Sequence, residues 1–297
     1  MIAKSLSIAL VFSCCGVALA QKEAADFQWV NPLPKNAPDS VKHGTFECQA
    51  TGGSVGYCIL LPPDYTDPAN AETRYPVVYW LHGGRPGSET KNIRLAPKIF
   101  ALMESGRVPG MIYVFPNGGR LSHYDHEDSP GETAFLELVR HVDRTYRTIA
   151  DHKGRAIEGF SQGGRGAGRY LLKHPELFCS AAPMGGGHQH EKFISENEGS
   201  EYGRFKLADP RNNTYDLARD YSSRKHPPLR ILIVVGQEDM NHGANLDWHQ
   251  HLLDQNIRHK FKTLPGVGHS AMDVYDKIGE EIMNFHAESF RQLGGIE

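Results

Sequence analysis

The chain has 297 residues, of which 39% are hydrophobic and 23% charged, and its formal net charge is −3 at pH 7. A chain of this size and composition can bury one sizeable core, so we expect one large domain. Charges of both signs are spread along the sequence without a basic stripe, which argues against nucleic acid as a partner.

Residues 1–20 have the pattern of a signal peptide. A lysine near the start precedes a mostly apolar run over 6–19, and small residues favour cleavage near Ala20. The run is shorter than the roughly 20 residues that a membrane-spanning helix needs. We therefore expect a secreted or periplasmic protein with no membrane segment after cleavage. A lipid on Cys14 or Cys15 is the alternative.

Residues 21–42 predict an extended lead-in. Pro32, Pro34 and Pro38 occur there in a polar setting, which disfavours a packed helix or strand. The main domain is expected to cover 43–297.

A hairpin is predicted at the start of this domain, with strands at 45–49 and 55–61 joined by a Thr-Gly-Gly-Ser turn at 51–54. Cys48 and Cys58 flank the turn. If the turn is centred on its second glycine, the two sulfur atoms face each other. In an exported protein we then expect a disulfide that staples the hairpin.

The rest of the domain alternates continuous apolar runs with amphipathic segments. The runs predict buried, largely parallel strands at 77–81, 111–115, 156–159, 179–184 and 231–235, with a further strand at 260–264. The amphipathic segments predict helices at 132–146, 163–174, 245–256 and 272–290.

This alternation predicts an α/β protein with a doubly wound, mostly parallel sheet, helices on both faces and the N-terminal antiparallel hairpin at one side. Cys179 lies in an apolar run and is expected to be a buried small hydrophobe. Residues 185–221 lack clear periodicity, so we expect an insertion over the carboxyl edge of the sheet.

The most informative motif is Gly159-Phe160-Ser161-Gln162-Gly163, which lies between a predicted strand and a predicted helix. This is the G-x-S-x-G nucleophile elbow in the context that it requires. The serine occupies a strained turn with its hydroxyl exposed, and glycines prevent collisions with the neighbouring strand and helix. Ser161 is therefore the predicted nucleophile.

A serine hydroxyl needs a base, and an acid must orient that base. Asp239 follows the strand at 231–235, with Glu238 as its nearest rival, and His269 lies on a glycine-flanked loop after the strand at 260–264. The order Ser, Asp, His is that of α/β-hydrolases. We predict that Ser161, His269 and Asp239 form a catalytic triad.

Backbone amides must hold the oxyanion that forms during attack. One is expected from Gln162, the residue after the nucleophile, and another from Gly83, Gly84 or Arg85 in the turn after the strand at 77–81. His82, at the start of this turn, is interpreted as structural.

Other polar clusters are weaker candidates. From their proximity to these loops, we expect Arg85, Tyr124 and Trp248 to line an acyl pocket. Two sets contain residue types that can bind metals, but both lie in polar sequence and are interpreted as solvated loops: His188, His190 and Glu191; and His123, Asp125, His126 and Asp128. We expect no metal and no cofactor.

The elbow and triad motifs, with Val77-Val78-Tyr79-Trp80-Leu81-His82-Gly83-Gly84 and Asp143-Arg144-Thr145-Tyr146-Arg147-Thr148, resemble the esterase D-type family. The resemblance covers about 45–290. Two positions depart from it, since family members often carry a small residue where Glu158 stands and an apolar residue where Gln162 stands. Gln162 is tolerable because its amide is what matters, whereas Glu158 adds an ionisable group near the site.

The resemblance implies an α/β-hydrolase fold and a serine carboxylic ester hydrolase that works through an acyl-enzyme. Because the protein is expected to be exported, feruloyl or acetyl esters of plant cell-wall polysaccharide are the favoured substrates. Siderophore esterase, acyltransferase and S-formylglutathione hydrolase activities are alternatives within the family. A non-catalytic carbohydrate-binding protein is the alternative outside it.

Overall fold

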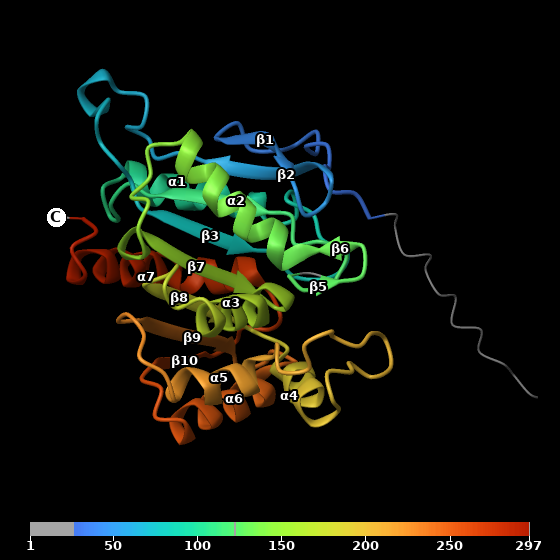
Figure 1. The fold of residues 1–297 in the computed structure, drawn as a ribbon. Helices are drawn as coiled ribbons and strands as arrows, with labels where there is room; N and C mark the ends of the chain where they lie inside the picture. The colour runs from blue at the N-terminus through green and yellow to red at the C-terminus, as the bar shows by residue number, and fades with distance from the viewer. Residues whose placement is uncertain (1–26, 122, 297) are drawn as a thin grey trace, which may run out of the picture.

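The computed structural model describes residues 27–121 and 123–296, and the predicted signal peptide lies outside this part of the chain. A twisted eight-stranded sheet forms its centre, in the order β1-β2-β4-β3-β7-β8-β9-β10 (Figure 1). The first two pairings are antiparallel and the others parallel. The strands are β1 (Val41–Cys48), β2 (Gly53–Leu60), β3 (Val77–Leu81), β4 (Ile112–Pro116), β7 (Arg155–Phe160), β8 (Ser180–Met184), β9 (Arg230–Gly236) and β10 (Lys260–Leu264); β5 (Asp125–His126) and β6 (Ser129–Pro130) form a separate small ladder.

Helices cover both faces of the sheet (Figure 1). They are α1 (Ala96–Glu104), α2 (Gly131–Thr145), α3 (Gln162–Lys173), α4 (His188–Glu196), α5 (Thr214–Ser222), α6 (His242–Asp254) and α7 (Ala271–Gln292). One core packs α2, α3, α5 and α6 against the sheet, and the other packs α1 and α7 against the opposite face. Tyr79 enters the first core and its neighbour Trp80 the second, as the alternation of a strand requires. The predicted doubly wound architecture is confirmed.

The predicted disulfide between Cys48 and Cys58 is wrong. In the β1–β2 hairpin, Cys48 lies opposite Gly53 and Cys58 lies opposite His43, so the two cysteines are not cross-strand partners. Their side chains also enter the cores on opposite faces of the sheet, and both thiols are free. The turn comes earlier than expected, directly after Cys48. Cys179 is buried, as predicted, and burial raises the pKa of its thiol to about 12.

The lead-in contacts the domain through Trp29 and Asn31. Trp29 packs against the core on the α2 side, and the amide of Asn31 donates to Glu89 Oε1 at 2.7 Å. The other oxygen of Glu89 accepts from the side chain of Asn117 at 3.1 Å. These contacts fix the middle of the lead-in beside the turn after β4.

Residues 185–221 contain α4 and all but the last residue of α5, two helices that the sequence did not predict. The buried positions of α4 include His188 and Glu191, so a search for apolar periodicity misses this helix. In contrast, α5 buries Tyr215, Leu217 and Tyr221, but it is only 9 residues long. Helix α4 packs against α5 and α6, helix α5 also packs against α3, and the segment between α4 and α5 projects beyond α4 (Figure 1).

Gly163 allows α3 to approach β3 closely. A Cβ atom at this position would lie 2.0 Å from the carbonyl oxygen of Leu81. Gly163→Ala is therefore expected to lower the free energy of unfolding by about 3 kcal/mol, because backbone atoms on both sides must move. Urea unfolding measures the effect.

Gly243 in α6 provides the matched control. A Cβ atom at this position would meet no other atom within 4 Å, so Gly243→Ala should leave stability unchanged or raise it by up to about 1 kcal/mol. Equal stability of the two variants would contradict the close approach at Gly163.

Candidate active site

Ser161 lies at the sharp turn between β7 and α3. Its backbone has φ 59° and ψ −115°, a conformation that costs energy for a residue with a side chain. Its amide donates to the carbonyl of Met184 on β8 at 2.9 Å, which ties the turn to the neighbouring strand. The backbone on the two sides of the turn is closely packed, since a Cβ on Gly159 would lie 2.6 Å from the carbonyl oxygen of Gly163. The turn therefore has the strained geometry of a nucleophile elbow.

The structure brings the three predicted triad residues together. The hydroxyl of Ser161 lies 2.9 Å from Nε2 of His269, and Nδ1 of the same ring lies 2.8 and 3.0 Å from the two carboxylate oxygens of Asp239. With the carboxylate ionised, Nδ1 carries the ring proton and Nε2 is free to accept the proton of Ser161. Ser161 thus donates to His269, and His269 donates to Asp239.

Asp239 is held in place by the loop after β9. Its carboxylate is buried and accepts from the amide of Asn241 at 2.7 Å. The side chain of Asn241 donates to the carbonyl of Gly185 at 2.9 Å, which anchors this loop to the end of β8. The adjacent Glu238 is exposed, so Asp239 and not its rival is the acid that contacts His269.

The turn after β3 lies beside the serine. A Cβ on Gly83 would lie 3.1 Å from Cβ of Ser161, which only a glycine allows without displacement. His82 fixes this turn, because its Nε2 accepts from the amide of Gly118 at 3.0 Å and its Nδ1 lies 3.2 Å from the carbonyl of Gly83. Burial lowers the pKa of His82 to about 3, so the ring is neutral. Each of its two nitrogen atoms has a backbone partner. These contacts agree with a structural role for His82.

Lys91, which no sequence motif indicates, also holds the turn. Its ammonium group donates to the carbonyl of Gly83 at 3.3 Å and to that of Pro86 at 2.5 Å. Gln162 begins α3 on the other side of Ser161, so its amide points out of a helix N-terminus. The turn and the start of α3 thus both lie next to Ser161.

Two of the three predicted pocket residues cannot line a pocket. Tyr124 and Trp248 are fully buried, so neither presents a surface to a substrate. Trp248 stacks on the ring of His188 in the interior, and the hydroxyl of Tyr124 donates to Glu191. Arg85 alone is partly exposed, in the turn beside Ser161. Proximity in sequence to loops was a poor guide because the side chains of Tyr124 and Trp248 point inward.

The interpretation of the histidine clusters as solvated loops is wrong for several members. His188 and Glu191 lie on the buried side of α4, and His123 is fully buried with Nε2 3.0 Å from the carbonyl of His82. Asp125 accepts from two amides at the start of α2. Among the residues that the structure describes, no group of three or more histidine, cysteine or acidic side chains is placed to hold a metal ion.

Glu158, whose role the sequence left unassigned, belongs to a buried network under the sheet. It accepts from the hydroxyl of Tyr275, and its other oxygen lies 3.3 Å from Nε2 of His286. Nδ1 of His286 in turn lies 2.6 Å from the hydroxyl of Ser180. These side chains are fully buried, so the network ties α7 to β7 and β8 and does not reach a substrate.

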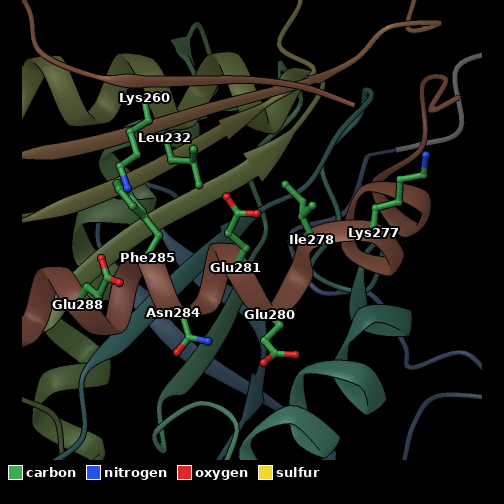
Figure 2. Close-up of a pocket in the computed structure, with 9 residues that line it drawn as sticks. All are labelled: Leu232, Lys260, Lys277, Ile278, Glu280, Glu281, Asn284, Phe285 and Glu288. Atoms are coloured by element: carbon green, nitrogen blue, oxygen red, sulfur yellow. The ribbon is translucent and has the colours of Figure 1, made fainter. Parts of the chain in front are cut away.

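A pocket of about 440 Å³ lies elsewhere, between α7 and the edge of the sheet (Figure 2). Its lining includes Leu232, Lys260, Glu281 and Phe285, from β9, β10 and α7. None of the predicted site residues lines it. Its lining has charges of both signs and includes no residue of the elbow, so nothing connects it with Ser161. In the described part of the chain, no helix is long and apolar enough to cross a membrane.

The sheet order and the serine at its elbow define the α/β-hydrolase class of proteins. Residues 48–276 match the model of the family described as "Putative esterase". Since this match covers more than half of the chain, the chain belongs to that esterase family.

Two curated relatives match parts of the chain. An esterase of Mycobacterium tuberculosis is 30% identical over 148 residues, which are 48% of this chain and 31% of the relative. An endo-1,4-beta-xylanase/feruloyl esterase of Xylanibacter ruminicola is 25% identical over 175 residues, which are 55% of this chain and 24% of the relative. The matches thus span about a third or less of these longer proteins.

Solved structures share the fold over nearly their whole length. A ferulic acid esterase superposes with a TM-score of 0.70 at 22% identity, covering 84% of this chain and 98% of that one. An S-formylglutathione hydrolase of Staphylococcus aureus superposes with a TM-score of 0.66 at 18% identity, covering 83% and 98%. These likenesses establish the α/β-hydrolase fold.

Proposed function

We propose that this protein is a serine ester hydrolase in which Ser161, His269 and Asp239 act as a catalytic triad. The observation that carries the proposal is the continuous hydrogen-bonded chain from Asp239 through His269 to Ser161, on three loops at the same edge of the sheet. Membership of an esterase family supports the reaction class.

In the first half of the reaction, Nε2 of His269 takes the proton of Ser161 while the serine oxygen attacks the ester carbonyl carbon. The carboxylate of Asp239 stabilises the imidazolium that forms. The tetrahedral intermediate collapses when His269 donates this proton to the oxygen of the departing alcohol. The acyl group then remains on Ser161. Water then attacks the acyl-enzyme and gives a proton to His269. The second tetrahedral intermediate collapses as His269 passes this proton to the oxygen of Ser161, which releases the acid and restores the serine.

The oxyanion of each tetrahedral intermediate is assigned to the amide of Gln162 and an amide of the Gly83–Gly84 turn. Gly83 supports this assignment by its close approach to Ser161, since a bulkier residue would push the turn away. Amides that are fixed before the reaction stabilise the developing charge without having to reorganise.

For the substrate, we propose feruloyl or acetyl esters of plant cell-wall polysaccharide, acted on outside the cytoplasm. A relative and a solved structure named as feruloyl or ferulic acid esterases support this choice. The pattern of residues 1–20 supports export. The structural neighbour named as an S-formylglutathione hydrolase favours a second candidate, a small thioester substrate.

A panel of four substrates tests the choice: methyl ferulate, acetylated xylan, p-nitrophenyl acetate and S-formylglutathione. We expect kcat/KM for methyl ferulate, or for acetyl release from xylan, to exceed that for S-formylglutathione at least tenfold. A preference for S-formylglutathione would keep the acyl-enzyme mechanism but reject the polysaccharide substrate. If polysaccharide is bound and no ester is cleaved, the protein is a non-catalytic binder.

A further inference from the structure

Glu201 lies between α4 and α5, and its carboxylate is fully buried although it carries charge. It forms a two-point contact with Arg85: Nη2 donates to Oε2 at 2.8 Å and Nη1 to Oε1 at 3.3 Å. Arg85 directly follows Gly84 in the turn beside Ser161. The segment at 185–221 therefore contacts the turn through a bidentate ion pair, which fixes orientation as well as distance.

The same carboxylate contacts the helix that begins at the elbow. Nη2 of Arg165 donates to Oε2 of Glu201 at 3.3 Å, and Nδ1 of His190 lies 3.1 Å from Oε1. Arg165 is one helical turn after the serine, and its amide donates to the carbonyl of Ser161 at 3.1 Å. Burial alone would raise the pKa of Glu201, but His190, Arg165 and Arg85 lower it well below its usual range.

We propose that Glu201 is a positioning residue that sets the spacing between the Gly83–Arg85 turn and the start of α3. The inference rests on the proposed function, in which these two elements supply the oxyanion donors. They come from separate parts of the chain, and Glu201 joins them through Arg85 on one side and Arg165 on the other. Donors that shift by a fraction of an ångström stabilise the oxyanion less well, so the link acts on the rate of the chemical step.

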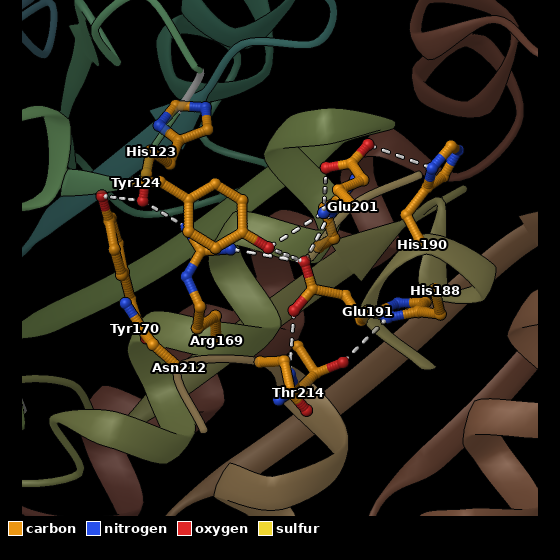
Figure 3. A network of polar contacts seen from close by, with 12 residues as sticks. His123, Tyr124, Arg169, Tyr170, His188, His190, Glu191, Glu201, Asn212 and Thr214 are labelled. Carbon is orange, nitrogen blue, oxygen red and sulfur yellow. Dashed lines mark hydrogen bonds and ion pairs between the residues drawn. The ribbon is translucent and has the colours of Figure 1, made fainter. Parts of the chain in front are cut away.

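Glu191 offers a matched comparison, and Figure 3 shows both carboxylates in one buried network. Glu191 is also fully buried and accepts from Nε of Arg165 at 2.6 Å. Its other partners include Arg169 and the amide of Thr214 at 2.8 Å. These partners lie on α3 and at the start of α5, not in the turn after β3. A purely structural role would make the two glutamates equivalent.

The test compares Glu201→Gln with Glu191→Gln on the full chain, using p-nitrophenyl acetate. Glu201→Gln is expected to lower kcat about 10- to 100-fold with KM changed less than threefold, because a loosened donor affects mainly the transition state. Glu191→Gln is expected to reduce stability while kcat stays within threefold. Binding of phenylboronic acid, which forms a tetrahedral adduct on a catalytic serine, should weaken only in Glu201→Gln.

Arg85→Met removes the other partner of the Arg85–Glu201 ion pair, at a partly exposed position. This variant replaces Glu201→Gln in the test if Glu201→Gln fails to fold. It should lower kcat by a similar factor, and the double variant should be no worse than either single one. The inference about Glu201 would be overturned if the two glutamate substitutions had equal effects on kcat, or if kcat were unchanged in both Glu201→Gln and Arg85→Met. Neither result would affect the proposed function. Activity that survives Ser161→Ala would instead overturn the proposed function.

Discussion

Replacing Ser161 with alanine is expected to lower kcat for ester hydrolysis by about 10⁶-fold. The substitution removes the only oxygen that can form the acyl-enzyme in the proposed mechanism, while the backbone amides and the substrate contacts remain. KM should therefore change little. Steady-state kinetics with p-nitrophenyl acetate, and intact-mass detection of labelling by a fluorophosphonate, measure the loss. The folded variant should take up no label.

Ser180 provides the control for this experiment, because it is another serine in contact with a histidine. Its hydroxyl lies 2.6 Å from Nδ1 of His286, and Nε2 of the same ring lies 3.3 Å from Glu158. A serine, a histidine and an acid are thus in contact here as in a catalytic triad. Full burial prevents contact with a substrate. Ser180→Ala should lose about 1–3 kcal/mol of stability and keep its kcat. If Ser161→Ala retained activity and Ser180→Ala did not, our choice of nucleophile would be wrong.

Asp239→Asn is expected to lower kcat by about 10⁴-fold. The amide side chain cannot stabilise the imidazolium, and its NH₂ group favours the tautomer of His269 that carries the proton on Nε2. That tautomer cannot accept the proton of Ser161. The substitution is nearly isosteric and the loop is anchored by Asn241, so the fold should persist. Circular dichroism and thermal unfolding check that it does.

Glu238→Gln is the paired control, since it neutralises the adjacent carboxylate. Glu238 is exposed, and its backbone amide, not its side chain, holds the loop through the carbonyl of Val267 at 3.0 Å. Its kcat should stay within twofold of the wild-type value. A larger loss in Glu238→Gln than in Asp239→Asn would show that Asp239 is not the acid of the triad.

The strands of the central sheet and the order of the site residues could be predicted because they depend on short stretches of sequence. The run 260–264 has the bounds of β10, and the Gly-x-Ser-x-Gly motif lies where β7 meets α3. The helix α4 could not, since His188 and Glu191 occupy buried positions and Glu191 finds its partner on α3. Apolar periodicity carries no signal for such a face.

The sequence by itself determined the sheet class, the elbow and the chain order of Ser161, Asp239 and His269. These follow from local patterns of hydrophobicity and glycine. Tertiary structure alone decided that Cys48 and Cys58 lie on opposite faces, that Tyr124 and Trp248 are buried, and that Glu201 joins Arg85 to Arg165. Such facts depend on strand register and on contacts between segments far apart in the chain, and a shift of one residue reverses the face on which a side chain lies.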